Sequence, residues 1–434
     1  MLLSLALLLL APSCAQDPGA AQEPSGGFDP AALQAKVDEI TPRVAELRGW
    51  KFKRPVPAGV KTPQEFIEFA KAEFESEYGK EQLEAMNQEY RLLGLMDPDL
   101  DLYRAMLDLL ESQVGGFYDP KTETFYMIST FNAGMMADII MAHELTHALD
   151  DQYYELDAMF EDARDLNSDS EFAMRAVVEG SGTSLMNLYT MQGMMKGWLT
   201  MDADSVEQMN EMMELSTEGL EEAPPFLVMT LALPYLEGNK FLVQQSSTMA
   251  AAMKAPSAED LDRAFRQPPV SSEQVLHFEK YWDEEQLDLP VEVALPDLSA
   301  KLGAGWKLLD EDTFGELACF VVTADELPNL ADAAAQMSAK WTNEAATGWG
   351  GDRLQLYGGP DGAHLAVWAT VWDSVEDAGE FSAAIHGRMG DNPFLREVLD
   401  GEKAVVLLYA DEEGAARAAE LSALAREAAA SLLE

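Results

Sequence analysis

The stretch 137–157, ADIIMAHELTHALDDQYYELD, holds two of the five histidines of the chain, and a glutamate directly follows the first. On a helix, positions i and i+4 lie one turn apart on the same face, so His143 and His147 can offer imidazole nitrogens to one ion. Glu144 lies beside the pair and can take a proton from a water on the metal. Two histidines that only pack a helix are the competing interpretation. Because an HExxH arises rarely by chance in so histidine-poor a chain, the spacing predicts a metal site.

Two histidines leave such a site incomplete, because catalytic zinc normally has three protein ligands and one open position. The other histidines lie far downstream, but Glu179, in AMRAVVEGSGT, follows His147 by 32 residues on a separate predicted helix. The small residues after it allow that helix to press against the metal helix, and a metal would compensate a charge that ends an apolar run. We predict Glu179 as the third ligand, with Glu171 and Asp151 as reserves. An ordinary helix-end glutamate is the alternative.

The elements that must position these residues are mostly helical. Helical spacing of apolar residues covers residues 29–96, 99–114, 137–157 and 169–195. Thr62 and Glu65 form a capping box at the start of one helix. GGFYDPKTETFYMIS predicts a β-hairpin directly before the metal helix. Its second strand, Thr124–Ile128, is expected either to be an edge that pairs with an extended substrate or to be a buried central strand.

The pattern changes after Pro290. GGDRLQLYGG and AHLAVWATVWD alternate like paired strands around the turn GGPDG, and SVEDAGEFSAAI, KAVVLLYAD and a closing alanine-rich segment predict helix, buried strand and helix. This part contains no nucleotide-binding glycine pattern, so a packing role is expected. We predict an α+β, mostly helical fold, with one domain over residues 29–290 and a C-terminal α/β region over residues 291–434 that packs on it or completes it.

The N-terminus predicts export. The apolar run Leu2–Ala11 is shorter than the roughly 20 residues that span a bilayer and suits a signal peptide over residues 1–14, although no Lys or Arg precedes it. APSC, which ends at Cys14, resembles a bacterial lipoprotein cleavage box and predicts lipidation there. Residues 15–28 have the composition of a flexible tether. The only other cysteine is Cys319, so loss or lipidation of Cys14 excludes an intrachain disulfide.

The charge balance restricts the partners. The chain has 77 acidic and 29 basic residues, a formal net charge of -48, with 47% hydrophobic residues. Such a surface repels nucleic acid and anionic lipid headgroups. We therefore expect no nucleic-acid partner, and contact with a membrane only through an N-terminal lipid anchor.

HELTHALDDQ followed by AVVEGSGT resembles the gluzincin metallopeptidases, whose two zinc-binding histidines and third glutamate come in this order. The chain also resembles a little-characterised group of bacterial and archaeal HExxH proteins. That likeness rests on GFYDPKTETFYM, PYLEGNKF, PPVSSEQVLHFEKY, GWGGDRLQLY and VWATVWDSVEDA, and extends from about Val56 onward. The resemblance implies a zincin-like catalytic domain, one zinc ion held by His143, His147 and Glu179, Glu144 as general base, and a peptide or protein substrate.

The chain departs from the gluzincin pattern at one position. Several gluzincins carry an aspartate four residues after the third ligand, which orients a histidine, and this chain has Thr183 there. The hydrogen-bond partners of the histidines must therefore come from elsewhere, and Asp150 and Asp151 are the candidates.

A peptidase also needs a donor that stabilises the oxyanion of the tetrahedral intermediate. Tyr235, His277 and Tyr281 are the candidates, because each lies in a segment that resembles the family. His277 is the first choice, since a histidine can donate to an oxyanion. A histidine that packs or caps a helix is the alternative.

Together these patterns predict an exported zinc metallopeptidase that hydrolyses peptide bonds through a metal-activated water. The alternative is a surface lipoprotein that binds a metal or a partner without catalysis, but a site used only for binding has no need of Glu144 as a base. A structural surface protein with an incidental histidine pair is the third interpretation. Zinc follows from the ligand types, which also accept Mn, Co or Ni.

Overall fold

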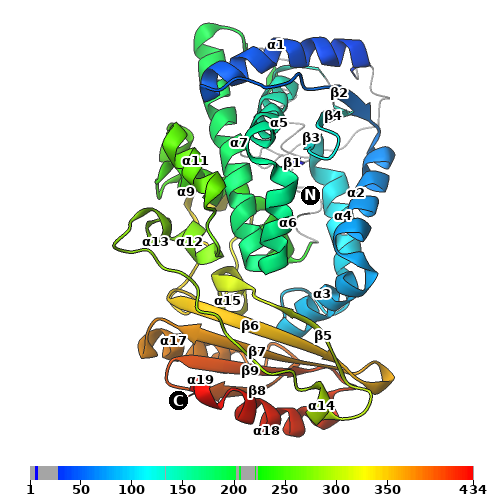
Figure 1. Cartoon of the computed structure of the whole chain (residues 1–434), viewed down its shortest axis with the longest axis vertical. Helices are drawn as coiled ribbons and strands as arrows, with labels where there is room; N and C mark the ends of the chain where they lie inside the picture. Colours follow the sequence, from blue (N-terminus) through cyan, green and yellow to red (C-terminus); the bar gives the residue numbers. More distant parts are fainter. Residues whose placement is uncertain are drawn as a thin grey trace.

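The fold is α+β, as predicted, with 56% helix and two sheets. The computed structural model describes residues 5–7, 28–131, 133–201, 205–206, 220 and 223–433. Figure 1 shows an elongated molecule with a helical part at one end and a five-stranded sheet at the other. The predicted lipidation site Cys14, and nearly all of the predicted signal peptide and tether, lie outside the described residues.

The helical part contains long helices that follow one another along the chain. They are α1 (Pro30–Arg48), α2 (Pro63–Glu77), α3 (Gly79–Leu93), α4 (Leu102–Gln113), α5 (Met135–Tyr154), α6 (Leu156–Leu166), α7 (Ser168–Lys196) and α9 (Pro225–Val243). Shorter helices follow: α10 (Thr248–Ala252), α11 (Ala258–Arg266), α12 (Ser272–Leu276) and α13 (Glu279–Trp282). The capping box predicted at the start of α2 is confirmed, since the Thr62 side chain accepts from the Glu65 amide and the Glu65 side chain accepts from the Thr62 amide.

A four-stranded sheet lies beside α5. Its strands are β1 (Leu5–Leu7), β2 (Ala58–Lys61), β3 (Val114–Asp119) and β4 (Thr124–Ile128), in the order β1-β3-β4-β2. The predicted hairpin is confirmed as the antiparallel pair β3–β4. Of the two alternatives for Thr124–Ile128, the central strand is confirmed and the edge strand is not, because β2 pairs with it in parallel on the side away from β3. Strand β2 was not predicted, because residues 29–96 were assigned as helical. Its four residues are too few to show an alternation of apolar and polar side chains.

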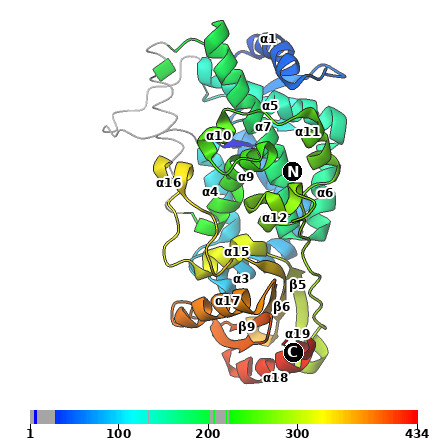
Figure 2. The ribbon, with the colours of Figure 1, turned by 90° about the vertical axis from the view of Figure 1, so that its left-hand side faces the viewer.

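The C-terminal part is built on an antiparallel five-stranded sheet, in the order β5-β6-β7-β9-β8. Its elements are α14 (Ser299–Leu302), β5 (Lys307–Asp312), α15 (Gly315–Thr323), α16 (Ala333–Ser338), β6 (Trp349–Gly358), η1 (Pro360–Gly362), β7 (His364–Trp372), α17 (Val375–Gly387), β8 (Leu395–Asp400), β9 (Ala404–Ala410), η2 (Ala415–Arg417), α18 (Ala418–Ala428) and α19 (Ala430–Leu433). Figure 2 shows this sheet at the end of the molecule opposite α1, with α15 between the sheet and the helical part. The predicted strands, helix and buried strand are all present.

One apolar core joins the two parts. A cluster of buried side chains runs from α2, α3 and α4 through α7 and α9 to α15 and one face of the second sheet, where Trp349 and Trp368 are fully buried. A second cluster packs α1 against β3, β4, α5 and α7, and a third covers the other face of the second sheet with α18. The C-terminal sheet is thus continuous with the core of the helical part.

Helices α7 and α9 pack closely through two glycines. A Cβ on Gly180 would lie 2.3 Å from the carbonyl carbon of Gly238, and a Cβ on Gly238 would lie 2.0 Å from the carbonyl oxygen of Ala176. Any side chain there would force the two helices apart. By length and composition α9 could cross a membrane, but 89% of its apolar window is buried inside the molecule, which is typical of a core helix.

Candidate metal centre

Helix α5 carries the histidine pair through the interior of the helical part. Its residues from Ala137 to Gln152 are all buried, which leaves no solvated face on that stretch. His143 and His147 lie one turn apart, with their Nε2 atoms 2.8 Å from each other and their rings nearly perpendicular, at 86°. Their nitrogens therefore point at the same small volume, as the i, i+4 spacing predicts.

The predicted third ligand reaches this volume from α7. The Oε2 atom of Glu179 lies 3.1 Å from Nε2 of His143 and 3.4 Å from Nε2 of His147. Ligand atoms of a tetrahedral zinc site with bonds of about 2.0–2.1 Å are separated by roughly 3.3 Å. The three atoms thus have nearly the spacing that a single zinc ion requires.

The charges at this site fit a metal. Glu179 and His147 are 0% exposed and His143 is 1% exposed, so the carboxylate lies far from water. Burial lowers the pKa of His143, as does the neighbouring His147, which favours the neutral imidazole that binds metals. Burial alone would raise the pKa of Glu179, but the two histidines more than offset this and lower it. A buried carboxylate beside two imidazoles is a donor set for a divalent cation.

Glu144 is held beside the pair by the hairpin. Its Oε2 accepts a hydrogen bond of 2.7 Å from the backbone amide of Tyr118 in β3. Ligand atoms of His143, Glu144 and His147 all lie within 4.8 Å of one another. The carboxylate is therefore close enough to exchange a proton with a water in the space that the histidines face.

Packing of small and aromatic side chains sets the orientation of the histidines. A Cβ on Gly182 would lie 2.6 Å from Cε1 of His143 and 2.8 Å from Cε1 of His147, so only glycine fits there. The Tyr235 ring of α9 stacks on His143, with ring centroids 5.7 Å apart. The expectation that small residues after Glu179 let α7 press on the metal helix is confirmed.

The expected hydrogen-bond partners of the histidines are wrong. Asp150 accepts from Ser181, at 2.5 Å, and pairs with Arg48 of α1, whereas Asp151 accepts from the hydroxyl of Tyr118 and from a backbone amide. In the described chain, the buried Nδ1 atoms of both histidines and the buried hydroxyl of Thr183 have no hydrogen-bond partner. Close packing thus replaces the carboxylate that several gluzincins place one turn after the third ligand.

The reserve ligands and two of the oxyanion candidates have other partners. Glu171 bonds to Tyr78 and Arg175, two turns of α7 before Glu179. His277 bonds to Glu316 at 3.0 Å, and the hydroxyl of Tyr281 donates to a backbone carbonyl at 2.7 Å. Among the contacts of the described residues, none joins His277 or Tyr281 to the histidine pair.

The choice of His277 as the first oxyanion candidate is therefore not supported by the structure, and Tyr235 is the candidate that contacts His143. Burial would lower the pKa of His277, but its hydrogen bond to the Glu316 carboxylate raises the pKa above the usual value. Nothing in the sequence indicated Glu316 as the partner of His277, because 39 residues separate the two.

Two contributors to the site were missed. The amide of Tyr118 carries no side-chain signature, and Arg48 lies 102 residues from Asp150, on a helix that looked unrelated. The glycines were the one usable indication: an AVVEGSGT run on a helix marks a place where another backbone or a ring comes very close.

Comparison with known proteins gives one match. Residues 306–422 match the model of a domain of unknown function, DUF8575. The match covers β5 to α18 and leaves the histidine pair and Glu179 outside it. No curated protein and no solved structure matches the chain.

Proposed function

We propose that this chain is an exported zinc peptidase whose metal is held by His143, His147 and Glu179. The observation that carries the proposal is the convergence of two imidazole nitrogens and one carboxylate oxygen within 3.4 Å, buried, with a second carboxylate beside them. A site used only to bind a metal needs no carboxylate such as Glu144 next to its open position. The order of the ligands along the chain, His, His, Glu, supports a zincin-like catalytic domain of the gluzincin type.

In this proposal each residue of the site has a separate role. Zinc held by His143, His147 and Glu179 would supply a Lewis acid for the scissile carbonyl and for the attacking water. Glu144 would take the proton from the attacking water and pass it to the leaving amine. The amide of Tyr118 fixes one oxygen of that carboxylate, and Tyr235 supplies the hydroxyl that stabilises the oxyanion.

The substrate strand is assigned to β3 and not to β4. Described residues Leu5–Leu7 form β1 and pair with β3 in an antiparallel ladder, with Leu5 opposite Phe117 and Leu7 opposite Val114. Removal of the signal peptide would free that edge of β3. An extended peptide could then take the place of β1, one strand away from Glu144.

The test is cleavage of a fluorogenic peptide library by residues 29–434, compared with Glu144→Gln. We expect turnover that falls by at least roughly a hundredfold in the variant, because a general base contributes about 10²–10⁴ and the glutamine cannot accept the proton. Zinc content, measured by elemental analysis, should be equal in both proteins. Equal zinc with no turnover in either protein would instead support the metal-binding lipoprotein.

A further inference from the structure

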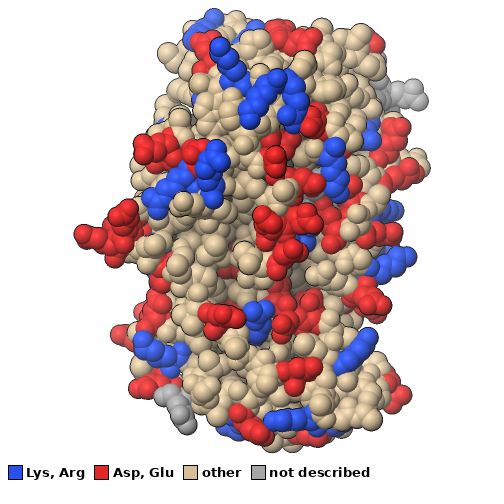
Figure 3. Space-filling model, viewed as in Figure 1, with Lys and Arg blue, Asp and Glu red and all other residues tan. Residues whose placement is uncertain are grey.

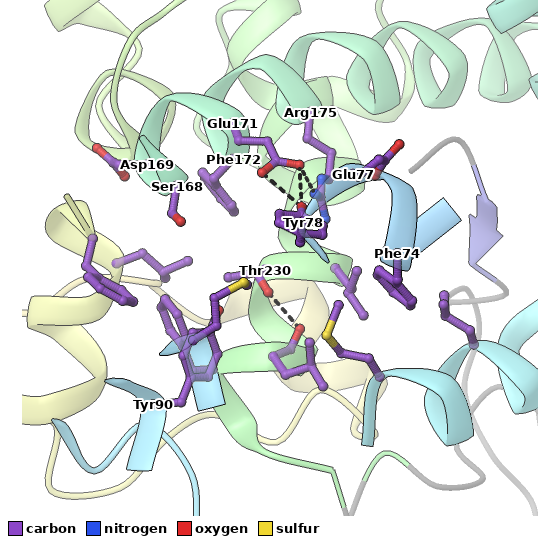
Figure 4. Close-up of a pocket in the computed structure, with 18 residues that line it drawn as sticks. Phe74, Glu77, Tyr78, Tyr90, Ser168, Asp169, Glu171, Phe172, Arg175 and Thr230 are labelled. Carbon is purple, nitrogen blue, oxygen red and sulfur yellow. Dashed lines mark hydrogen bonds and ion pairs between the residues drawn. The ribbon is translucent and has the colours of Figure 1, made fainter. Parts of the chain in front are cut away.

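A cavity lies next to the proposed metal centre, between α2, α3, α4, α7, α9 and α15 (Figure 4). The space among its lining side chains is about 870 Å³, including the part that is open to solvent. Its apolar walls include Phe74, Tyr90, Phe172, Phe226, Leu231 and Phe314.

The charged groups of the cavity are already neutralised. Figure 4 shows Glu171 bonded to both Tyr78 and Arg175, at 3.2 and 3.0 Å. Glu77 faces a guanidinium of α6 at 3.7 Å. The remaining lining carboxyl is Asp169, whose pKa burial raises to about 8. A charged ligand would have to separate one of these pairs, whereas an apolar ligand leaves them intact.

The cavity and the proposed metal centre are one helical turn apart on two helices. On α7, Arg175 lines the cavity and Glu179 follows one turn later; on α9, Leu231 lines it and Tyr235 follows one turn later. One such step is about 6 Å along a helix axis. The two sites therefore lie on the same faces of the same two helices.

Helix α4 forms a third side of the cavity, and it is followed in the chain by β3, the strand that would hold a substrate. Leu110 of α4 lines the cavity, and β3 begins four residues later at Val114. The chain's own segment Leu5–Leu7, with the sequence Leu-Ala-Leu, lies on the edge of that strand. Figure 3 shows the molecular surface hollowed near the middle of the face over these helices, among acidic side chains.

We infer that this cavity is a specificity pocket for a large apolar side chain of the substrate, aromatic or leucine-like. The inference rests on the proposed function. An extended peptide advances about 3.3 Å per residue, so a pocket roughly 6–12 Å from the metal suits a side chain two or three residues from the scissile bond.

The test uses five mixtures of randomised decapeptides, each with one central position fixed as Phe, Leu, Ala, Lys or Glu. Thr230→Phe fills the cavity from α9, and Leu231→Ala enlarges it. Thr190→Phe on α7 is the matched control, because Thr190 and Thr230 each donate a hydroxyl hydrogen bond of 2.9 Å within their own helix and only Thr230 lines the cavity. Cleavage sites are mapped by mass spectrometry.

We expect the native chain to cleave the Phe and Leu mixtures faster than the others, with those residues two or three positions from the cut. Thr230→Phe should lower the Phe-to-Ala ratio of kcat/KM by roughly tenfold or more, and Thr190→Phe should leave it unchanged. Leu231→Ala should shift the preference toward Phe over Leu. Cleavage with no size preference, or a preference that Thr230→Phe leaves intact, would overturn the pocket while the peptidase stands.

Binding separates this proposal from the proposed catalysis. Fluorescein-labelled mixtures are titrated into Glu144→Gln alone and into Glu144→Gln with Thr230→Phe. Tighter binding of the Phe mixture that the second change removes supports the pocket even if no peptide is cut. Equal affinity for all five mixtures rejects the pocket.

Discussion

The candidate metal centre and the cluster around Lys280 each bring several metal-binding groups close together, but the negative charge is balanced in a different way at each. Each brings at least three groups that could hold a metal to within 4.8 Å of one another. At the second cluster, the ammonium of Lys280 already lies among the carboxylates, 2.6 Å from Glu273, 2.8 Å from Asp288 and 3.1 Å from Asp373. The protein therefore supplies that cation itself.

At the metal centre no lysine or arginine is recorded in contact with Glu179 among the described residues, and its near neighbours are imidazoles. Proximity of acidic groups thus indicates a metal only where the protein provides no cation. Two further buried carboxyls complete the comparison, because Asp150 is paired with Arg48 and the pKa of Asp169 is raised enough for a proton to neutralise it.

The largest expected effect is loss of the metal. His147→Ala removes one of three ligands, and the variant should lose its zinc on dialysis, whereas the native chain keeps about one ion. Excess zinc should raise the Tm of the native chain, because a ligand that binds only the folded state stabilises it. Asp373→Asn, in the lysine cluster, is the control and should keep zinc and the Tm response. Zinc loss in Asp373→Asn with retention in His147→Ala would reverse the assignment.

The second prediction concerns Asp150, the buried carboxylate that pairs with Arg48. Arg48→Met leaves Asp150 buried and unpaired three residues after His147, and should lower the free energy of unfolding by about 3–5 kcal/mol. Arg48 also donates to Ser181 at 2.8 Å, so the same change loosens the crossing of α5 and α7. Urea denaturation of the zinc-free protein measures the effect. Arg104→Met, at a highly exposed ion pair, is the control and should change stability by less than about 1 kcal/mol.

Removing the lysine should turn its cluster into a cation site. Lys280→Met leaves three carboxylates facing one another and should cost about 2 kcal/mol or more, since one buried charge loses its partner. Calcium at millimolar concentration should restore part of this stability, because oxygen ligands at this spacing suit it. The native chain should not respond in this way, and a variant indifferent to calcium would count against the comparison.

A further effect, expected at Asp169, depends on pH. Burial, together with the nearby carboxyls of Asp352 and Glu316, raises its pKa to about 8 in the folded chain, so the folded state binds the proton more tightly than the unfolded state does. This contribution to stability is complete below about pH 4 and is lost as the pH rises toward 8, at up to about 1.4 kcal/mol per pH unit.

Asp169→Asn tests that expectation. The amide cannot titrate, and its oxygen can still accept the hydrogen bond of 3.0 Å from the amide of Ser272. Its unfolding free energy should fall less steeply between pH 5 and 8 than that of the native chain. Parallel slopes in the two proteins would show that Asp169 does not titrate in this range.

The sequence was sufficient where the decisive contacts are local. The capping box of Thr62 and Glu65 and the β3–β4 hairpin follow from spacing within a few residues, and all are present. The alignment of His143 with His147 follows from helix geometry alone. Glu179 was also found, because glycines directly after a buried charge mark a close approach.

Where several partners were equally plausible, the sequence could not choose. His277 was the first choice as oxyanion donor and bonds to Glu316. The sequence left Thr124–Ile128 open between an edge and a central strand, and β2 covers it. Each outcome depends on which helices and strands pack together through their apolar faces. That choice is set by the apolar area buried over the whole core.

The sequence by itself determined which groups meet: two imidazoles and a carboxylate at a fixed spacing on one helix, in a chain with a formal net charge of -48. Only the tertiary structure decided how each buried carboxylate is neutralised, by imidazoles, arginine, lysine or a proton. The physical reason is that helix geometry fixes neighbours within one turn. The partner of a buried charge is set by groups that lie far away in the sequence, such as Arg48, 102 residues before Asp150.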